Sequence, residues 1–258
     1  MEAYIGLREY ARRLDIEAGD TVFISSDAKR LLWDALSNRA KPELNEFIDG
    51  LIEAVGPKGS VIFPTYNWDF CSGIAFDFHN TECRTGTLGS LALERGDFKR
   101  TKHPIYSFAV YGRCQDVLCS MENKDSFGMD SPFAFFHEHN VKNYMVDVSL
   151  QHCFTFTHYV EQCCGVKYRF IKDFTAGYLD ENGLAGQRSY SMFVRDLNLD
   201  VETTIDPIEE DLLAARALKK YRVNNSIIKL VFMGQAYEVL TKDITENKSR
   251  KLCTYKGQ

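Results

Sequence analysis

Apolar residues recur at two spacings in the first part of the chain, and each spacing predicts one type of element. Apolar side chains at helical intervals predict helices over residues 7–14 and 44–55, and Gly56-Pro57 ends the second of them. Short apolar runs predict strands over residues 21–26 and 60–65. Together the two strands and the helical segment between them form a β-α-β unit of the length that a parallel crossover requires.

Strands and helices continue to alternate along the chain, and the pattern then turns more antiparallel. The predicted elements are a helix at 88–93, a strand at 106–111, a helix at 131–139, a strand at 144–148, a helix at 154–163, strands at 174–178 and 190–194, a helix at 209–220, a strand at 227–232 and a helical segment from 234. The sequence Asp180-Glu181-Asn182-Gly183 predicts a hairpin turn. We therefore expect an α/β fold, a single three-layer α/β/α domain over residues 1–258 with a mixed central sheet and a more antiparallel C-terminal portion.

Composition and charge are those of a globular protein. Hydrophobic residues make up 45% and charged residues 26% of the 258 residues, and no apolar stretch approaches the length of a membrane span. No signal peptide is evident and the eight cysteines form no CxxC pair, so we expect a cytoplasmic protein with free thiols. The net charge of -5 argues against general nucleic-acid binding and is compatible with a cationic substrate.

The strongest chemical signal is the segment 155–161, which reads Thr-Phe-Thr-His-Tyr-Val-Glu and follows the predicted strand at 144–148. His158 and Glu161 are three positions apart, so they share one face of a helix. A histidine beside a carboxylate can accept a proton near neutral pH, as the deprotonation of an amine or a water requires. The alternative interpretation is a capped helix with these two residues near its first turn.

Further polar residues follow the predicted strands, where open α/β sheets bind their ligands. Ser25-Ser26 follow the first strand and can hold a phosphate or a polarised carbonyl, or simply cap a helix. Asp69 and Asp77 can hold an ammonium or sugar hydroxyls, or remain solvated. Residues 100–104 form a basic cluster that suits the phosphates of a cofactor, although a solvated turn explains it equally well.

Several common motifs are absent. The chain has no GxxxxGK[ST], GxGxxG or GxSxG, which argues against nucleotide hydrolysis, dinucleotide redox chemistry and ordinary hydrolase chemistry. HExxH is also absent and the histidines are dispersed, so we expect no metal site. Residues 162–167 approach the pyrophosphate loop of the common acetyltransferase superfamily, but Lys167 stands where that loop has Gly or Ala, and we interpret the match as accidental.

A series of short segments carries a family resemblance in its order along the chain. The segments are 19–21 with 25–26, LIEAVGPKGS at 51–60, FPTY at 63–66, RTGTLG at 84–89, RTKHP at 100–104 with Ser107, FGMDSP at 127–132, TFTHYVE at 155–161 and GQA at 234–236. Taken together, they resemble the aminoglycoside 3-N-acetyltransferase family from about Leu7 to Ala236. No single segment decides this, but the collinear series is specific.

The resemblance implies transfer of an acetyl group from acetyl-coenzyme A to an amino group of a sugar-like acceptor. It implies a general-base role for His158 with Glu161 and Thr157 beside it, and direct transfer without an acyl-enzyme. For the cofactor it implies contacts by Ser25, Ser26, Arg100, His103, Ser107 and Phe127. For the acceptor we expect contacts by Thr65, Asp69, Asp77, His152 and Thr155. We also expect a small-molecule acceptor, no nucleic-acid or membrane partner, and assembly as a homodimer.

One departure from the family pattern bears on the acceptor. Antibiotic-modifying members commonly have an Asp six residues before the motif histidine, and here that position is His152. Loss of a carboxylate near the amine favours an amino sugar linked to a nucleotide over an aminoglycoside, which stays an alternative. Two other classes remain open: a non-catalytic protein that binds coenzyme A or a sugar, and a metal-dependent hydrolase that uses His152, His158, Glu161 and Cys153.

Overall fold

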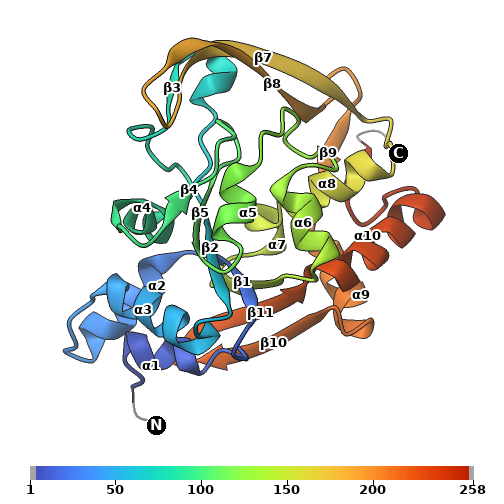
Figure 1. The fold of residues 1–258 in the computed structure, drawn as a ribbon. Coiled ribbons are helices and arrows are strands. Elements are labelled where there is room, and N and C mark those ends of the chain that lie inside the picture. The colour runs from blue at the N-terminus through green and yellow to red at the C-terminus, as the bar shows by residue number, and fades with distance from the viewer. Residues whose placement is uncertain (1–3, 256–258) are drawn as a thin grey trace.

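A seven-stranded mixed sheet forms the centre of the computed structural model, which describes residues 4–255 (Figure 1). Its order is β10-β11-β6-β1-β2-β5-β4, in which β6, β1 and β2 are parallel and the outer pairings are antiparallel. The strands are β1 (Thr21–Ser26), β2 (Ser60–Pro64), β4 (Lys99–Arg100), β5 (Phe108–Gly112), β6 (Lys142–Val146), β10 (Leu218–Val223) and β11 (Ser226–Phe232). The expected parallel crossover joins β1 to β2.

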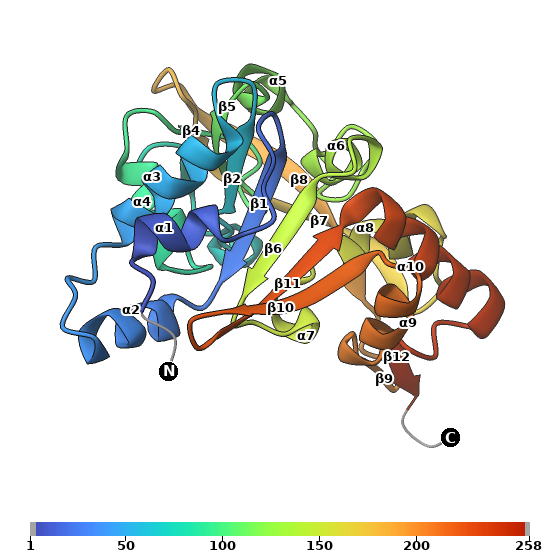
Figure 2. The same ribbon diagram turned by 90° about the horizontal axis from the view of Figure 1, so that it is seen from below.

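Helices cover both faces of this sheet, as Figure 2 shows from below. One face packs against α1 (Leu7–Arg12), α2 (Ala28–Ser37), α3 (Leu44–Val55) and α4 (Thr87–Glu94). The other packs against α5 (Gln115–Ser120), α6 (Pro132–Glu138), α7 (Leu150–Cys153), α8 (Phe156–Cys163), α9 (Glu209–Ala214) and α10 (Met233–Asn247). Side chains of β1 alternate between the two faces of the sheet. Val22 and Ile24 pack into the core under α1–α4, and Phe23 packs into the core on the opposite face. The predicted three-layer fold is confirmed.

A long hairpin arches over one end of the molecule (Figure 1). It consists of β7 (Arg169–Leu179) and β8 (Ala185–Arg195), and β3 (Phe76–Asp77) adds a short parallel strand to β7. Two backbone amides of the turn donate to the Asp180 carboxylate, as in an Asx turn. The hairpin was predicted, but its strands extend well beyond the expected residues. A second small sheet pairs β9 (Val201–Thr203) with β12 (Cys253–Tyr255), and short 3-10 turns lie at Asp69–Ser72 and Asp206–Ile208.

The predicted element pattern differs from the structure in several places, of which two are the largest. The helix expected over 209–220 is wrong beyond Ala214, because Arg216 takes a left-handed φ of 58° and Leu218 begins β10. Pairing of β10 with β11 outweighs the helix propensity of its Leu and Lys residues. The helix α2 was not predicted, since charged residues interrupt its apolar positions. Among the described residues, no helix is long and apolar enough to cross a membrane.

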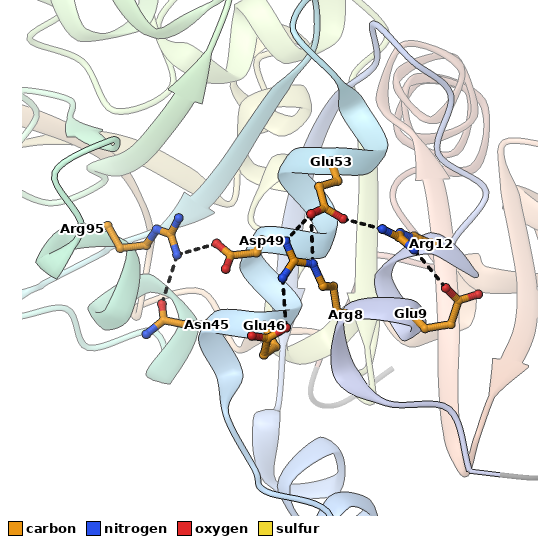
Figure 3. A network of polar contacts seen from close by, with 8 residues as sticks. All are labelled: Arg8, Glu9, Arg12, Asn45, Glu46, Asp49, Glu53 and Arg95. Atoms are coloured by element: carbon orange, nitrogen blue, oxygen red, sulfur yellow. Dashed lines mark hydrogen bonds and ion pairs between the residues drawn. The ribbon is translucent and has the colours of Figure 1, made fainter.

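The α1 helix lies against α3 with its backbone in close approach at Gly50. A Cβ atom built on Gly50 would lie 2.4 Å from the carbonyl oxygen of Arg8 and 2.8 Å from Ala11 Cβ. An ion-pair network surrounds this crossing (Figure 3), in which Glu53 accepts from Arg8 Nε at 2.9 Å and from Arg12 at 2.7 Å. These guanidinium groups hold the pKa of Glu53 down to about 2. Because these pairs are exposed to solvent, the close backbone approach contributes more to the packing than the ions do.

We predict that Gly50→Ala destabilises the protein by about 1–3 kcal/mol, the scale of an overpacked core position. The sign of this change in unfolding free energy is informative, because replacing Gly by Ala in a helix interior would otherwise stabilise the protein by about 1 kcal/mol. Denaturant unfolding measures the effect, with Gly186→Ala as the matched control, since a Cβ at Gly186 would meet no atom within 4 Å. Unfolding midpoints that are equal for the two variants would show that α1 can move away from α3 without cost.

Candidate active site

His158 and Glu161 make the contact that their spacing predicted. Both lie on α8, where His158 Nδ1 is 2.8 Å from Glu161 Oε2. The Glu161 side chain is fully buried, whereas that of His158 is 22% exposed. An ionised carboxylate can only accept a hydrogen bond, so Nδ1 carries the proton and Nε2 is left with its lone pair. Within residues 4–255, no hydrogen-bond partner contacts Nε2.

Two residues at the start of β7 fix the other contacts of Glu161. The Tyr168 hydroxyl donates to Oε1 at 2.9 Å. Arg169 Nε lies 2.7 Å from Oε2, an ionic contact whose N–H is not aligned as a hydrogen bond. Arg169 itself is buried and reaches the carbonyl of Phe193 and the hydroxyl of Thr203. A buried carboxylate without such partners would cost several kcal/mol or change its protonation state.

This environment sets the charge of the pair. Burial by itself would raise the pKa of Glu161, but the hydrogen bond from His158 and the charge of Arg169 hold that pKa below its ordinary value. Burial is the main cause that lowers the pKa of His158 from 6.5, the Arg169 charge adds to it, and Glu161 only partly offsets both. The imidazole is therefore neutral and the carboxylate ionised at pH 7. A neutral imidazole with a free Nε2 is the form that can accept a proton.

A cavity of about 370 Å³ lies beside the start of α8. It brings together four of the predicted site residues, Ser25, Ser26, His152 and Thr155. The other lining residues are Phe23, Pro64, Tyr66, Trp68, Arg84, Thr85, Val148 and Cys153. Thr155 is three positions before His158, so His158 lies one turn further along the same side of α8.

The topology of the sheet explains why the cavity is here. The chain crosses from β1 to β2 on one side and later returns to place β6 on the other side of β1. A crevice opens at such a switch point, beyond the carboxyl ends of the strands. Ser25 and Ser26 end β1 there, and Val148 lies just beyond β6. Ser25 is buried, with its hydroxyl 3.5 Å from Asn143 Oδ1 of the neighbouring strand.

Two predicted residues pack around His158 without lining this cavity. The Phe127 ring contacts the imidazole edge to face, at 5.7 Å between centroids, and also packs on Tyr106. Phe127 therefore forms a wall of the histidine site. Thr157 is fully buried, and within the described chain its hydroxyl has no hydrogen-bond partner. Their predicted cofactor and catalytic roles stay predictions.

Arg100, Ser107 and Thr65 form a separate buried cluster. Arg100 Nε donates to Ser107 Oγ at 3.1 Å, and its terminal nitrogens reach the carbonyls of Thr81 at 2.6 Å and Thr65 at 3.5 Å. The Ser107 hydroxyl lies 2.8 Å from both Thr65 Oγ1 and the Thr65 carbonyl. Burial lowers the pKa of Arg100 to about 10. Since these donors bind backbone carbonyls, their observed role is to join β2, β5 and the loop before Arg84.

His103 is likewise directed inward. Its Nδ1 accepts from the backbone amides of Ile105 and Tyr106 at 3.2 and 3.1 Å, which shapes the loop before β5. Burial lowers the pKa of His103 to about 3, so the ring is neutral. A neutral ring bonded to its own loop offers no charge to a phosphate. The phosphate contacts expected of Arg100 and His103 stay predictions.

The two loop carboxylates already have partners. Asp69 Oδ2 lies 3.1 Å from Arg84 Nη2, near the cavity. Asp77 accepts from the backbone amides of His79 and Asn80, so it organises the turn after β3. The side chain of Asn80, followed by these amides, lowers the pKa of Asp77. His152 is exposed at the cavity, with Nδ1 2.8 Å from Ser149 Oγ. Among residues 4–255, no three His, Cys, Asp or Glu side chains converge as metal ligands would.

Several residues of the site were not predicted. Tyr168 and Arg169 lie beyond α8, and their approach to Glu161 depends on a tertiary turn for which the local sequence gave no signal. Arg84 belonged to a matched family segment without a role assigned to it. Trp68 lies in the loop after the second predicted strand without a role assigned to it, and its indole nitrogen donates to the Tyr106 hydroxyl at 3.4 Å.

Comparison with solved structures finds the same fold in other proteins. A YokD protein from Bacillus subtilis has 19% identity and a TM-score of 0.76, covering 95% of this chain and 94% of its own. An AAC-VIa structure with bound sisomicin has 19% identity and a TM-score of 0.77, covering 95% and 99%. An AAC-IIIb binary structure with CoASH has 16% identity and a TM-score of 0.78, covering 95% and 98%. At these identities the likeness shows the fold. No curated protein matches the sequence.

The family is shown by a sequence model rather than by these folds. The model described as aminoglycoside 3-N-acetyltransferase matches residues 33–245, which is most of the chain and includes α8 and its His158–Glu161 pair. The segments that suggested the resemblance between 51 and 236 fall within this range. The chain therefore belongs to the aminoglycoside 3-N-acetyltransferase family and is an N-acetyltransferase that uses acetyl-coenzyme A as its co-substrate.

Proposed function

We propose that this enzyme acetylates the amino group of an amino sugar linked to a nucleotide, by direct transfer from acetyl-coenzyme A with His158 as the general base. The observation that carries the proposal is the neutral His158, held by buried Glu161 and placed one helical turn from a cavity at the switch point of the sheet. A second observation, the charge of that cavity, favours the nucleotide-linked acceptor.

The proposed reaction starts from the ammonium form of the acceptor. His158 Nε2 accepts one ammonium proton, and the Glu161 carboxylate stabilises the imidazolium that forms. The nitrogen lone pair then attacks the thioester carbonyl carbon and forms the C–N bond. Hydroxyl groups that line the cavity, those of Ser26 and Thr155, are the proposed donors to the oxyanion. As the C–S bond breaks, the thiolate takes the proton from the imidazolium and leaves as coenzyme A, and the new amide nitrogen releases its second proton to water.

A covalent acyl-enzyme is not needed for this chemistry. Cys153 is the thiol nearest to the reactants, since it lines the cavity. Burial raises its pKa to about 12, and its thiol donates to the Ser149 carbonyl at 3.2 Å. A protonated, buried thiol is a poor nucleophile. Direct transfer is therefore the simpler proposal.

The cavity charge bears on the choice of acceptor. Within the described residues, no lining side chain carries a carboxylate, whereas Arg84 and His152 both line it. Asp69 neutralises Arg84 rather than standing free. Aminoglycosides carry several positive charges, and binding them requires carboxylates that offset the loss of their hydration. An acceptor with a single amine and a nearby diphosphate needs fewer carboxylates.

We predict that His158→Ala lowers turnover by about a hundredfold or more at neutral pH, the usual scale of a lost general base. Binding of coenzyme A should change little, because the substitution removes a group that acts on the amine. Steady-state kinetics and calorimetric titration with coenzyme A measure the two effects separately. His139→Ala is the control, since that ring stacks on Phe135 away from the cavity. Turnover in His158→Ala equal to that of the control would remove His158 from the mechanism.

We predict a higher kcat/KM for a nucleotide-linked amino sugar than for a multiply charged aminoglycoside, because the cavity has no carboxylates for the extra ammonium groups. Rates of coenzyme A release with a UDP-linked amino sugar and with sisomicin, measured side by side, provide the test. Efficient acetylation of sisomicin with no reaction of nucleotide sugars would restore the antibiotic-modifying alternative. If no amine gives an acetylated product by mass spectrometry, the non-catalytic alternative holds instead.

A further inference from the structure

A second cavity adjoins the one that holds the proposed reactants. Its volume is about 540 Å³, and Asp27, Lys29, Arg30, Trp33 and Asp147 line it. The two cavities are contiguous along the chain, because Ser26 and Val148 line the first and their neighbours Asp27 and Asp147 line the second. The second cavity therefore lies at the same switch point, beyond the ends of β1 and β6 and along α2.

The α2 helix presents an aromatic ring and two cations to this cavity. Trp33 is 60% exposed, and Lys29 and Arg30 lie four and three positions before it, on the same side of the helix. The side chains of Lys29 and Arg30 are 91% and 51% exposed. Among residues 4–255, the Trp33 ring stacks on no other aromatic ring. Because the fold leaves this indole largely exposed, its free face is available to a ligand.

The two carboxylates of this cavity are built into the scaffold, while the two cations are not. Asp27 caps α2 by accepting from the Lys29 backbone amide at 3.0 Å. Asp147, with a left-handed φ of 54°, accepts from the Ile227 amide at 2.9 Å. The ion pairs of Lys29 with Asp27 and of Arg30 with Asp147 are long, at 3.9 and 3.7 Å. Both pairs are long and both cationic side chains are exposed, so either cation can turn to meet an anion.

We propose that this cavity binds a nucleoside diphosphate group carried by one of the two reactants. The exposed face of Trp33 stacks on the base, and Lys29 and Arg30 bind the diphosphate, with the guanidinium of Arg30 suited to paired phosphate oxygens. The remainder of that reactant extends past Asp27 into the first cavity, toward His158. The inference rests on the proposed function, because both coenzyme A and a nucleotide-linked acceptor carry this group.

The test is direct binding, measured by calorimetry on the whole protein with coenzyme A and with UDP as the two probes. Trp33→Ala and Arg30→Gln should each lower the affinity for one of the two probes by about tenfold or more, the scale of a lost base-stacking contact. The matched control is Leu36→Ala, on the same helix and 61% exposed but outside the cavity. It should bind both probes as the unmodified protein does.

The probe whose binding weakens identifies which reactant carries the nucleotide. Weaker binding of coenzyme A places its adenosine end on Trp33, and weaker binding of UDP places the acceptor there. If Trp33→Ala and Arg30→Gln bind both probes as the Leu36→Ala control does, or if neither probe binds the unmodified protein, the inference is overturned. Since binding is read without turnover, a protein that binds coenzyme A through Trp33 but acetylates no amine contradicts the proposed function and leaves this inference standing.

Discussion

The buried carboxylate of Glu161 is the constraint on which the rest of the site depends. It lies where α8 and the start of β7 meet, and its two oxygens contact His158, Tyr168 and Arg169. These contacts keep it ionised in a position that water does not reach. An ionised Glu161 orients the imidazole and fixes the proton on Nδ1, so that the other ring nitrogen is the one available for chemistry. The same contacts tie the arching hairpin to the helix that carries the base.

The sheet topology supplies the second requirement, a place for the reactants. β1 pairs with β2 on one side, and the chain later returns to place β6 on its other side. The connections therefore leave the carboxyl end of β1 uncovered, and both cavities are found there. Ser25 and Ser26 line the first cavity as the last residues of β1, and α2 begins two residues later, at Ala28, and borders the second cavity. The fold therefore places an acid-base pair and two neighbouring cavities together without a dedicated loop insertion.

Local sequence pattern predicted those features that depend on neighbours along the chain. The contact between His158 and Glu161 follows from three-residue spacing on a helix, and the hydroxyls of Ser25 and Ser26 follow from the end of a strand. The family and the three-layer fold were also predicted correctly. The part played by Arg169 was not, because its approach to Glu161 is set by packing between α8 and β7. The homodimer and the single-domain boundary remain predictions.

The basic cluster at residues 100–104 shows that local sequence does not predict whether a charged side chain is buried. Arg100 and His103 are basic in sequence and suggested a phosphate site, which stays a prediction; in the fold both are buried, Arg100 bonded to the Thr81 carbonyl and His103 to its own loop. Sequence shows which groups can bind an anion, but whether they face solvent depends on the packing of β4 and β5. The α2 cations Lys29 and Arg30, to which the sequence analysis assigned no role, are exposed at the switch point.

The central claim is that burial and the Arg169 charge keep His158 neutral while Glu161 fixes its proton on Nδ1, and nitrogen-15 NMR titration of the His158 ring tests it most directly. The account predicts a neutral ring with its proton on Nδ1 and a pKa below the ordinary 6.5, so the base form is present at pH 7 and is lost as pH falls through that lower pKa. In Glu161→Gln the pKa should fall further, because the carboxylate that favours the charged ring is gone. A pKa at or above 6.5, or a neutral ring protonated on Nε2, would contradict the account.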